Sequence, residues 1–263
     1  MFDRLKSLFS NVVSEREVLP ADTSSIAPND VLLVVGDVHG SFELLQKKFV
    51  EVDAFLEENE EKFGKMPQLV FVGDYIDRGE NSAEVLSWVF DLQQELPHLV
   101  TCLMGNHERM MIDFLDDPAG RGARWLRNGG LQTLASFKIG EVHERSDVEE
   151  LTEASHALEN AMPTGMLTWL RGLDLSYQSG NVCVVHAAMD PHLGIEDQLS
   201  NTLLWGHNEF MTRDRDDGNW VVHGHTIVRE PEIRKSRISI DTGAYHSGQL
   251  TVAVLSTGSC VFV

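Results

Sequence analysis

The stretch VLLVVGDVHG, residues 31–40, decides the fold. Its five apolar residues run into Gly36, which is the pattern of a short buried strand that ends at a glycine. Asp37 and His39 follow at once, and in extended backbone two residues at this spacing point to the same side. A carboxylate and an imidazole placed together are common metal ligands. A single Asp-x-His triplet would be weak evidence, because such triplets also arise by chance.

The same arrangement recurs four more times along the chain. Apolar runs lead into polar residues in LVFVGDYIDRG (69–79), LVTCLMGNHE (99–108), NVCVVHA (181–187) and WVVHGHT (220–226). Ligands of α/β sheets bind beyond the carboxyl ends of the strands. The sequence therefore predicts that one rim of the sheets carries six potential metal ligands, namely Asp37, His39, Asp74, Asn106, His186 and His225.

Size and charge narrow the class of protein. The chain has 263 residues, of which 42% are hydrophobic, enough for one large domain or two small ones. Its formal net charge of -20 repels nucleic-acid backbones, so we expect no nucleic-acid partner. No stretch approaches the length of a membrane-spanning helix, and we expect no stable membrane insertion. A phosphate site in so acidic a chain would need positive charge from bound dications and a few arginines.

The cysteines and the first thirty residues indicate where in the cell the protein is located. Cys102, Cys183 and Cys260 each lie in an apolar run and form no CxxC pair, which favours buried, reduced thiols and a cytoplasmic protein. Residues 1–30 are expected to be an amphipathic segment and a loop, without the pattern of a signal peptide.

The order of predicted elements indicates an α/β fold. Residues 31–104 alternate strand–helix–strand–helix–strand, which predicts parallel pairing with right-handed crossovers. Residues 116–180 break this rhythm and are expected to form a mostly helical insertion near the site. From residue 181 onward short strands dominate, and we expect a second sheet that is largely antiparallel at its end.

Taken together, GDVHG, GDYIDRG, GNHE, VHAA and HGHT resemble, in order, the phosphoprotein phosphatase (PPP) branch of the calcineurin-like metallophosphoesterases. The chain is most similar to small bacterial and phage-type members, and WL-x-NGG (125–130) and DTGA (241–244) also fit. The resemblance implies a four-layer α/β/β/α sandwich of two mixed sheets flanked by helices, with a dinuclear metal centre on one rim. Residues 31–263 would then be a single catalytic domain.

The resemblance also implies two metal sites that share one carboxylate. The first would consist of Asp37, His39 and Asp74, and the second of Asp74, Asn106, His186 and His225. Oxygen and imidazole ligands without thiolate suit Mn best, with Fe or Zn as alternatives. The competing interpretation is that these residues are helix caps and core histidines, but six of them at strand ends argue against it.

The resemblance assigns roles to three further residues. His107 would be the general acid that protonates the leaving oxygen, and Asp77 would orient its imidazole. The alternative for Asp77 is a carboxylate that only satisfies backbone N–H groups of its loop. Arg78, together with Asn106, would bind the substrate phosphate, since a guanidinium suits two phosphate oxygens. The alternative for Arg78 is a surface ion pair.

One expected feature is missing. Relatives carry a second phosphate-binding arginine, often two residues past a tryptophan, where LWGHNEF has His207. A neutral imidazole is a weaker donor than a guanidinium. Our hypothesis is that Arg213 or Arg215 supplies the second arm, with Arg124 or Arg127 of the insertion as other candidates. The competing interpretation is that all four arginines are solvated.

These features predict a metal-dependent phosphomonoesterase that needs no covalent phosphoenzyme. The favoured substrate is a phosphoprotein, at Ser/Thr or at Tyr, although a small phosphate ester also fits. The nearest rival is a symmetrical dinucleoside tetraphosphatase, which shares the same metal motifs. A catalytically silent binding module would not need His107, Asp77 and Arg78, so we consider it the weakest alternative.

Overall fold

The first sheet confirms the predicted parallel arrangement. The computed structural model describes residues 23–63 and 67–263, and its first sheet has the strand order β10-β9-β1-β2-β3. The strands β1 (Leu32–Val35), β2 (Gln68–Phe71) and β3 (Val100–Cys102) pair in parallel. The crossovers contain α2 (Phe42–Glu58), α3 (Glu60–Phe63) and α4 (Ser82–Glu95).

The end of the chain differs from the prediction. The strands β9 (Val252–Ser256) and β10 (Ser259–Phe262) are antiparallel, but β9 pairs with β1 and so extends the first sheet. Ala253 and Leu255 face the second sheet, whereas Val252 and Val254 face the helices. A strand that is apolar on both faces fits only where both faces are covered.

The second sheet has the order β4-β5-β6-β8-β7. Its central strands β5 (Val182–Val185), β6 (Trp220–His223) and β8 (Arg237–Ser239) are parallel. The outer strands β4 (Ser176–Ser179) and β7 (Glu232–Arg234) are antiparallel to their neighbours. Both sheets are therefore mixed, as predicted.

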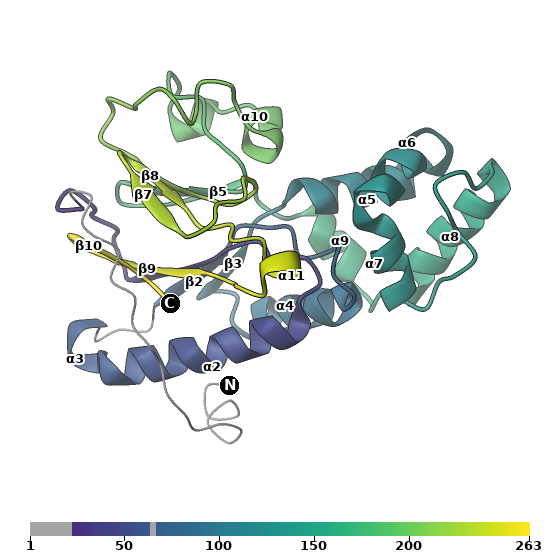
Figure 1. The fold of residues 1–263 in the computed structure, drawn as a ribbon, viewed down its shortest axis with the longest axis horizontal. Helices are drawn as coiled ribbons and strands as arrows, with labels where there is room; N and C mark the ends of the chain where they lie inside the picture. Colours follow the sequence, from purple (N-terminus) through teal and green to yellow (C-terminus); the bar gives the residue numbers. More distant parts are fainter. Residues whose placement is uncertain (1–22, 64–66) are drawn as a thin grey trace.

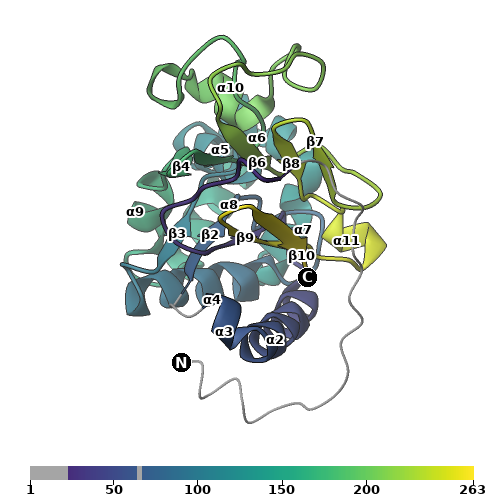
Figure 2. The ribbon, with the colours of Figure 1, turned by 90° about the vertical axis from the view of Figure 1, so that its left-hand side faces the viewer.

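The two sheets pack face to face, with helices outside. Alternation along β1 shows the layering, because Leu32 and Val34 pack between the sheets while Leu33 and Val35 pack against α2 and α4. Figures 1 and 2 show α2 and α4 on the outer side of the first sheet and α10 (Ser200–Trp205) with its loops on the outer side of the second. A short 3-10 turn, Ile195–Asp197, precedes α10.

Residues 116–180 are mostly helical and project to one side of the sandwich (Figure 1). The helix α5 (Asn106–Asp116) leads from β3 into this region. It is followed by α6 (Pro118–Trp125), a π-helical turn (Leu126–Gly130), α7 (Leu131–Ser136), α8 (Val148–Ala161) and α9 (Met166–Arg171). The acidic helix α8 buries Leu151, Ala154 and Leu158 on its inner face.

The expectation for the N-terminal amphipathic segment falls mainly on residues 1–22, which lie outside the described residues. Within the described ranges, no helix combines the length and apolar character that crossing a membrane requires. Cys102 and Cys183 are buried free thiols, and Cys260 is a partly buried one.

Candidate metal centre and catalytic site

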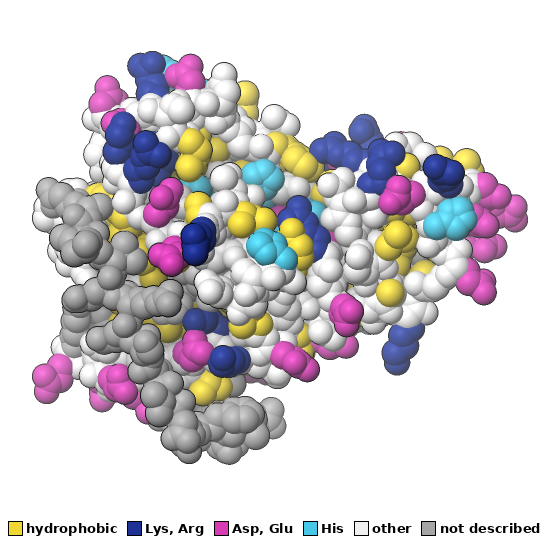
Figure 3. All heavy atoms as spheres, viewed as in Figure 1, with side chains coloured by type: hydrophobic (Ala, Val, Ile, Leu, Met, Phe, Trp, Pro, Cys, Tyr) yellow, Lys and Arg dark blue, Asp and Glu magenta, His cyan; other side chains and the backbone are white. Residues whose placement is uncertain are grey.

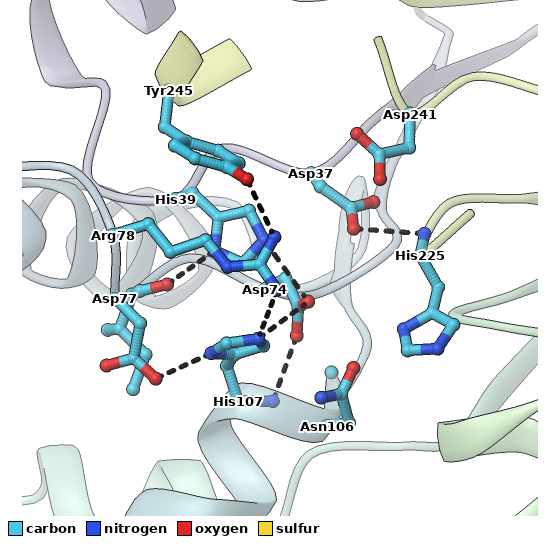
Figure 4. A network of polar contacts seen from close by, with 12 residues as sticks. Asp37, His39, Asp74, Asp77, Arg78, Asn106, His107, His225, Asp241 and Tyr245 are labelled. Carbon is cyan, nitrogen blue, oxygen red and sulfur yellow. Dashed lines mark hydrogen bonds and ion pairs between the residues drawn. The ribbon is translucent and has the colours of Figure 1, made fainter. Parts of the chain in front are cut away.

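The predicted ligands come together at the rim where the strands of both sheets end, although the local backbone differs from the expectation (Figure 4). β1 ends at Val35, and His39 has a φ of 45°, so Asp37 and His39 do not share an extended segment. His39 donates from Nδ1 to Ile76 O at 2.8 Å. Asp37 instead accepts from the backbone N of His225 at 3.0 Å.

Asp74 lies at the centre of the cluster and is only 2% exposed. Its Oδ2 lies 3.4 Å from His39 Nε2, and its Oδ1 lies 3.5 Å from His186 Nε2. Two groups of possible ligand atoms, each within 4.8 Å of one another, share this carboxylate: His39, Asp74 and His107 form one, and Asp74, His186 and His225 form the other. Burial opposes ionisation of Asp74, but the nearby His186, His107 and His39 lower its pKa overall.

The histidine lone pairs point inward. His186 Nδ1 donates to Val72 O at 3.1 Å, so its Nε2 lone pair faces Asn106 Oδ1 at 2.8 Å as well as Asp74. The Nε2 of His39 faces Asp74 in the same way, because Nδ1 of that ring is the donor. Imidazole lone pairs that face carboxylate and amide oxygens would repel them unless a cation lay between, so this arrangement fits a metal site.

The charges of the cluster fit divalent metals as well. Asp37 Oδ1 is buried and has no hydrogen-bond partner among the described residues. Burial and the neighbouring Asp241 raise the pKa of Asp37 well above its ordinary value. Burial lowers the pKa of His39 to about 3 and of His186 to about 4, so both rings are neutral and can act as ligands. A dication would compensate these crowded carboxylates.

The backbone around the cluster is strained. Positive φ values occur at His39 (45°), Asp74 (52°), Asp77 (71°), Arg78 (66°) and His225 (62°). Each costs on the order of 1–3 kcal/mol in a residue other than glycine, and such residues gather at functional sites. The surrounding packing therefore holds these side chains in orientations that an unstrained loop would not give.

Two glycines make room for the carboxylates. A Cβ at Gly105 would lie 2.1 Å from Asp74 Oδ1, and a Cβ at Gly224 would lie 1.9 Å from Asp37 Oδ1. Any larger residue at either position would push the carboxylate away. The glycines of GNHE and HGHT are thus needed for close approach to the cluster.

His107 and Asp77 form a buried pair beside the cluster. His107 Nδ1 donates to Asp77 Oδ2 at 2.6 Å, and Asp77 is fully buried. Trp125 Nε1 and Thr133 Oγ1 also donate to this carboxylate, at 3.0 Å and 2.6 Å. Burial alone would lower the pKa of His107, but the carboxylates of Asp74 and Asp77 raise it above the ordinary value of histidine.

The guanidinium of Arg78 lies between His107 and Tyr245 (Figure 4). Its Nη2 lies 3.3 Å from His107 Nε2, and its Nη1 donates to Tyr245 OH at 3.3 Å. The guanidinium also lies 5.0 Å from the centre of the Tyr245 ring, which is 37% exposed. Tyr245 therefore holds Arg78 at the edge of the site.

Glu108 has a structural role. Its buried carboxylate accepts from the backbone N–H groups of Gly105, Asp74, Tyr75 and Ile76, at 2.8–3.3 Å. One side chain thus ties the loop after β2 to the loop after β3.

Arg215, one of the two residues predicted to supply the second arm, makes its contacts elsewhere. Arg215 donates to the carbonyls of Asp190 and Leu193 and pairs with Asp217, and its side chain is only 3% exposed. Those contacts make it a structural residue, because the carbonyls and the carboxylate use its donors. Arg213 pairs with Glu209 at 3.6 Å.

Two histidines outside the cluster also have partners of their own. His207 Nε2 lies 3.6 Å from Asp190 Oδ2. His223 is fully buried against Ser239 and Phe210. Arg124 is different: its guanidinium lies over the ring of Trp205, 4.3 Å from the centre.

Sequence reasoning missed Trp125 and Thr133 as partners of Asp77. They follow it by 48 and 56 residues, and no local pattern links a tryptophan or threonine in the insertion to that carboxylate. The fit of WL-x-NGG to the family was the only signal for Trp125, and nothing marked Thr133.

With this geometry in hand, comparison with known proteins gives the family. The model of the calcineurin-like phosphoesterases matches residues 31–229, and the chain belongs to this family. The match covers β1 to the turn after β6 and includes all six predicted ligands.

Similar proteins include enzymes with different substrates. The asymmetrical bis(5'-nucleosyl)-tetraphosphatase PrpE of Oceanobacillus iheyensis is 28% identical, covering 83% of this chain and 86% of its own length. Serine/threonine-protein phosphatase 2 of Escherichia coli is 25% identical, covering 83% and 89%. The solved cold-active protein-tyrosine phosphatase of a psychrophilic Shewanella species has a TM-score of 0.53 at 18% identity, covering 93% and 85%, and shares the fold.

Proposed function

We propose that the chain hydrolyses phosphate esters or anhydrides at a dinuclear metal centre. The observation that carries this proposal is the buried Asp74 cluster with the His107–Asp77 pair directly beside it. The ligands would be those that the sequence indicated, with Asp74 shared: Asp37, His39, Asp74, Asn106, His186 and His225. Two divalent ions, Mn as first choice, would polarise the phosphoryl oxygens and lower the pKa of a water between them.

The residues beside the ligands would act on the substrate. Arg78 would bind phosphate oxygens with its planar fork, helped by the Asn106 amide. His107 would donate the Nε2 proton to the leaving oxygen, while Asp77 accepts from Nδ1–H and stabilises the protonated ring. The buried position of Asp77 keeps water from competing for this hydrogen bond.

We infer that the first substrate to test is a dinucleoside tetraphosphate cleaved asymmetrically, as the names of the PrpE relatives suggest. This differs from the symmetrical cleavage considered from the sequence. Phosphoprotein hydrolysis is the second candidate, supported by the similarity to serine/threonine-protein phosphatase 2. The three free cysteines support a cytoplasmic location.

The test compares three substrates: diadenosine tetraphosphate, a serine phosphopeptide and p-nitrophenyl phosphate. Chelation should abolish hydrolysis and Mn²⁺ should restore it. Asp74→Asn should abolish hydrolysis and weaken Mn²⁺ binding measured by calorimetry, whereas Asp91→Asn, on the exposed side of α4, should change neither. Full activity of protein shown by elemental analysis to be free of metal would refute the proposal.

A further inference from the structure

The helices α6 and α10 are in contact, and each is tied to the site by a hydrogen bond. The helix α6 ends at Trp125, whose indole donates to Asp77. The helix α10 is tied to the loop after β5, because Ala187 N donates to Leu203 O at 2.8 Å. Ala187 directly follows His186 of the cluster. A contact between α6 and α10 therefore links the part of the site that holds Asp77 to the part that holds His186.

That contact is made by Arg124 and Trp205. The guanidinium lies over the indole, 4.3 Å from its centre, which fixes the plane of the guanidinium. Over the described ranges 23–63 and 67–263, no hydrogen bond or ion pair of this guanidinium is formed with another residue. Its N–H donors, which lie at the edge of the stacked plane, are thus available to an anion.

Acidic residues outnumber basic ones by 41 to 21 in this chain, and several of its arginines are paired with carboxylates. Arg109 pairs with Asp113 and Arg171 with Asp116, for example. Figure 3 shows lysine and arginine side chains gathered over the α6 region, beside the site.

The π-helical turn places this region directly against Arg78. A Cβ at Gly129 would lie 2.5 Å from the backbone N of Arg78, so the two backbones are in contact. Asn128 Nδ2 donates to Arg124 O at 2.8 Å and joins this turn to the last turn of α6. Arg124 and Arg78 therefore belong to one packed unit on the side of His107, where the leaving group departs.

We propose that Arg124, stacked on Trp205, binds the phosphate of the leaving group that adjoins the reacting phosphorus. The proposal rests on the proposed function and assigns to this site a preference for substrates with a phosphate chain. A phosphomonoester has no second phosphate, so it gains nothing from this arm. The hydrogen bond is charge-assisted, and a guanidinium can hold two oxygens of one phosphate.

The experiment compares Arg124→Gln with the matched control Arg121→Gln, one helical turn earlier on α6 and also exposed. In the Mn²⁺-loaded protein, kcat/KM for diadenosine tetraphosphate should fall roughly 10–100-fold in Arg124→Gln, the range for a hydrogen bond to a charged group. The value for p-nitrophenyl phosphate should stay within about threefold of wild type. Arg121→Gln should leave both substrates near wild type.

Two further variants test the stacking itself. Trp205→Leu should lower kcat/KM for the tetraphosphate roughly 2- to 5-fold, the range for an exposed cation–π contact. Arg124→Lys keeps the charge but loses the planar fork and should not restore wild-type kcat/KM. Tripolyphosphate should inhibit Arg124→Gln less strongly than wild type, while inhibition by inorganic phosphate should not change.

Equal losses on both substrates, or no loss on either, would overturn the proposal. If the wild-type protein hydrolysed none of the substrates, the proposed function would fail separately. Calorimetric binding of tripolyphosphate to wild type and to Arg124→Gln would still decide whether the arm binds a phosphate chain.

Discussion

Replacing Asp77 by asparagine tests the role of the His107–Asp77 pair most directly. The carboxylate is fully buried and accepts from His107, Trp125 and Thr133. An amide of the same shape has one oxygen acceptor and no charge, so the hydrogen bond from the protonated His107 is lost or weakened. Such a charge-assisted bond is worth about 1.5–3 kcal/mol, which corresponds to roughly one to two units in the pKa of His107.

The direction of the pH effect follows from the role of the acid. His107 can donate only while it is protonated, so hydrolysis of substrates with poor leaving groups should decline as the pH rises through the pKa of His107. The neighbouring carboxylates raise that pKa in the wild-type protein. In Asp77→Asn the decline should therefore begin at lower pH.

The assay measures kcat/KM against pH for two aryl phosphates, one with a good and one with a poor leaving group. Above the pKa of His107 we expect a loss of roughly 10–100-fold for the poor leaving group, the factor that one to two pKa units give, and a much smaller loss for the good one. Asp113→Asn, which removes a surface carboxylate paired with Arg109, serves as control. Identical losses for the two phosphates, with both variants folded by circular dichroism, would refute the assigned role of the pair.

Two further predictions concern other parts of the site. Arg215→Ala should lower the free energy of unfolding in urea by about 3 kcal/mol, because the carbonyl and carboxylate partners of the buried guanidinium lose their donor. Its kcat at low temperature should remain near wild type. A tenfold loss of kcat in the folded protein would instead indicate that Arg215 is a phosphate arm. Gly224→Ala should weaken Mn²⁺ binding measured by calorimetry, because the added Cβ would displace the Asp37 carboxylate. The control Gly140→Ala, with open space around the position, should bind Mn²⁺ as wild type does. Unchanged Mn²⁺ affinity in Gly224→Ala would contradict the close approach of Gly224 to Asp37.

The parts that the sequence predicts well are those encoded locally. An apolar run, a glycine and a polar residue at the strand end fix β1, β2 and β3 and bring Asp37, Asp74 and Asn106 to one rim. The shared feature is that each strand is largely buried and leads to a glycine beside a polar residue. The backbone conformation of the site could not be predicted in this way, because the left-handed φ of His39 comes from packing against the loop after β2.

Contacts between distant segments could not be predicted in the same way. The pairing of β9 with β1 depends on which sheet edge is free. The sequence of a strand that is apolar on both faces does not indicate which sheet the strand joins. Arg215 lies in a run of alternating charges, RDRDD, that suggests a solvated loop. Its burial requires the carbonyls of Asp190 and Leu193, which only the folded chain brings near.

The position of α6 has a consequence for inhibition. Compounds that chelate metals act on many enzymes with dinuclear centres, and offer little selectivity. The stack joins Arg124 of the insertion to Trp205 of α10, and the residue after Arg124, Trp125, donates to Asp77. A flat anionic molecule that took the place of the Trp205 indole on Arg124 would bind next to Trp125 without touching a metal ligand, so selectivity could be sought at this contact.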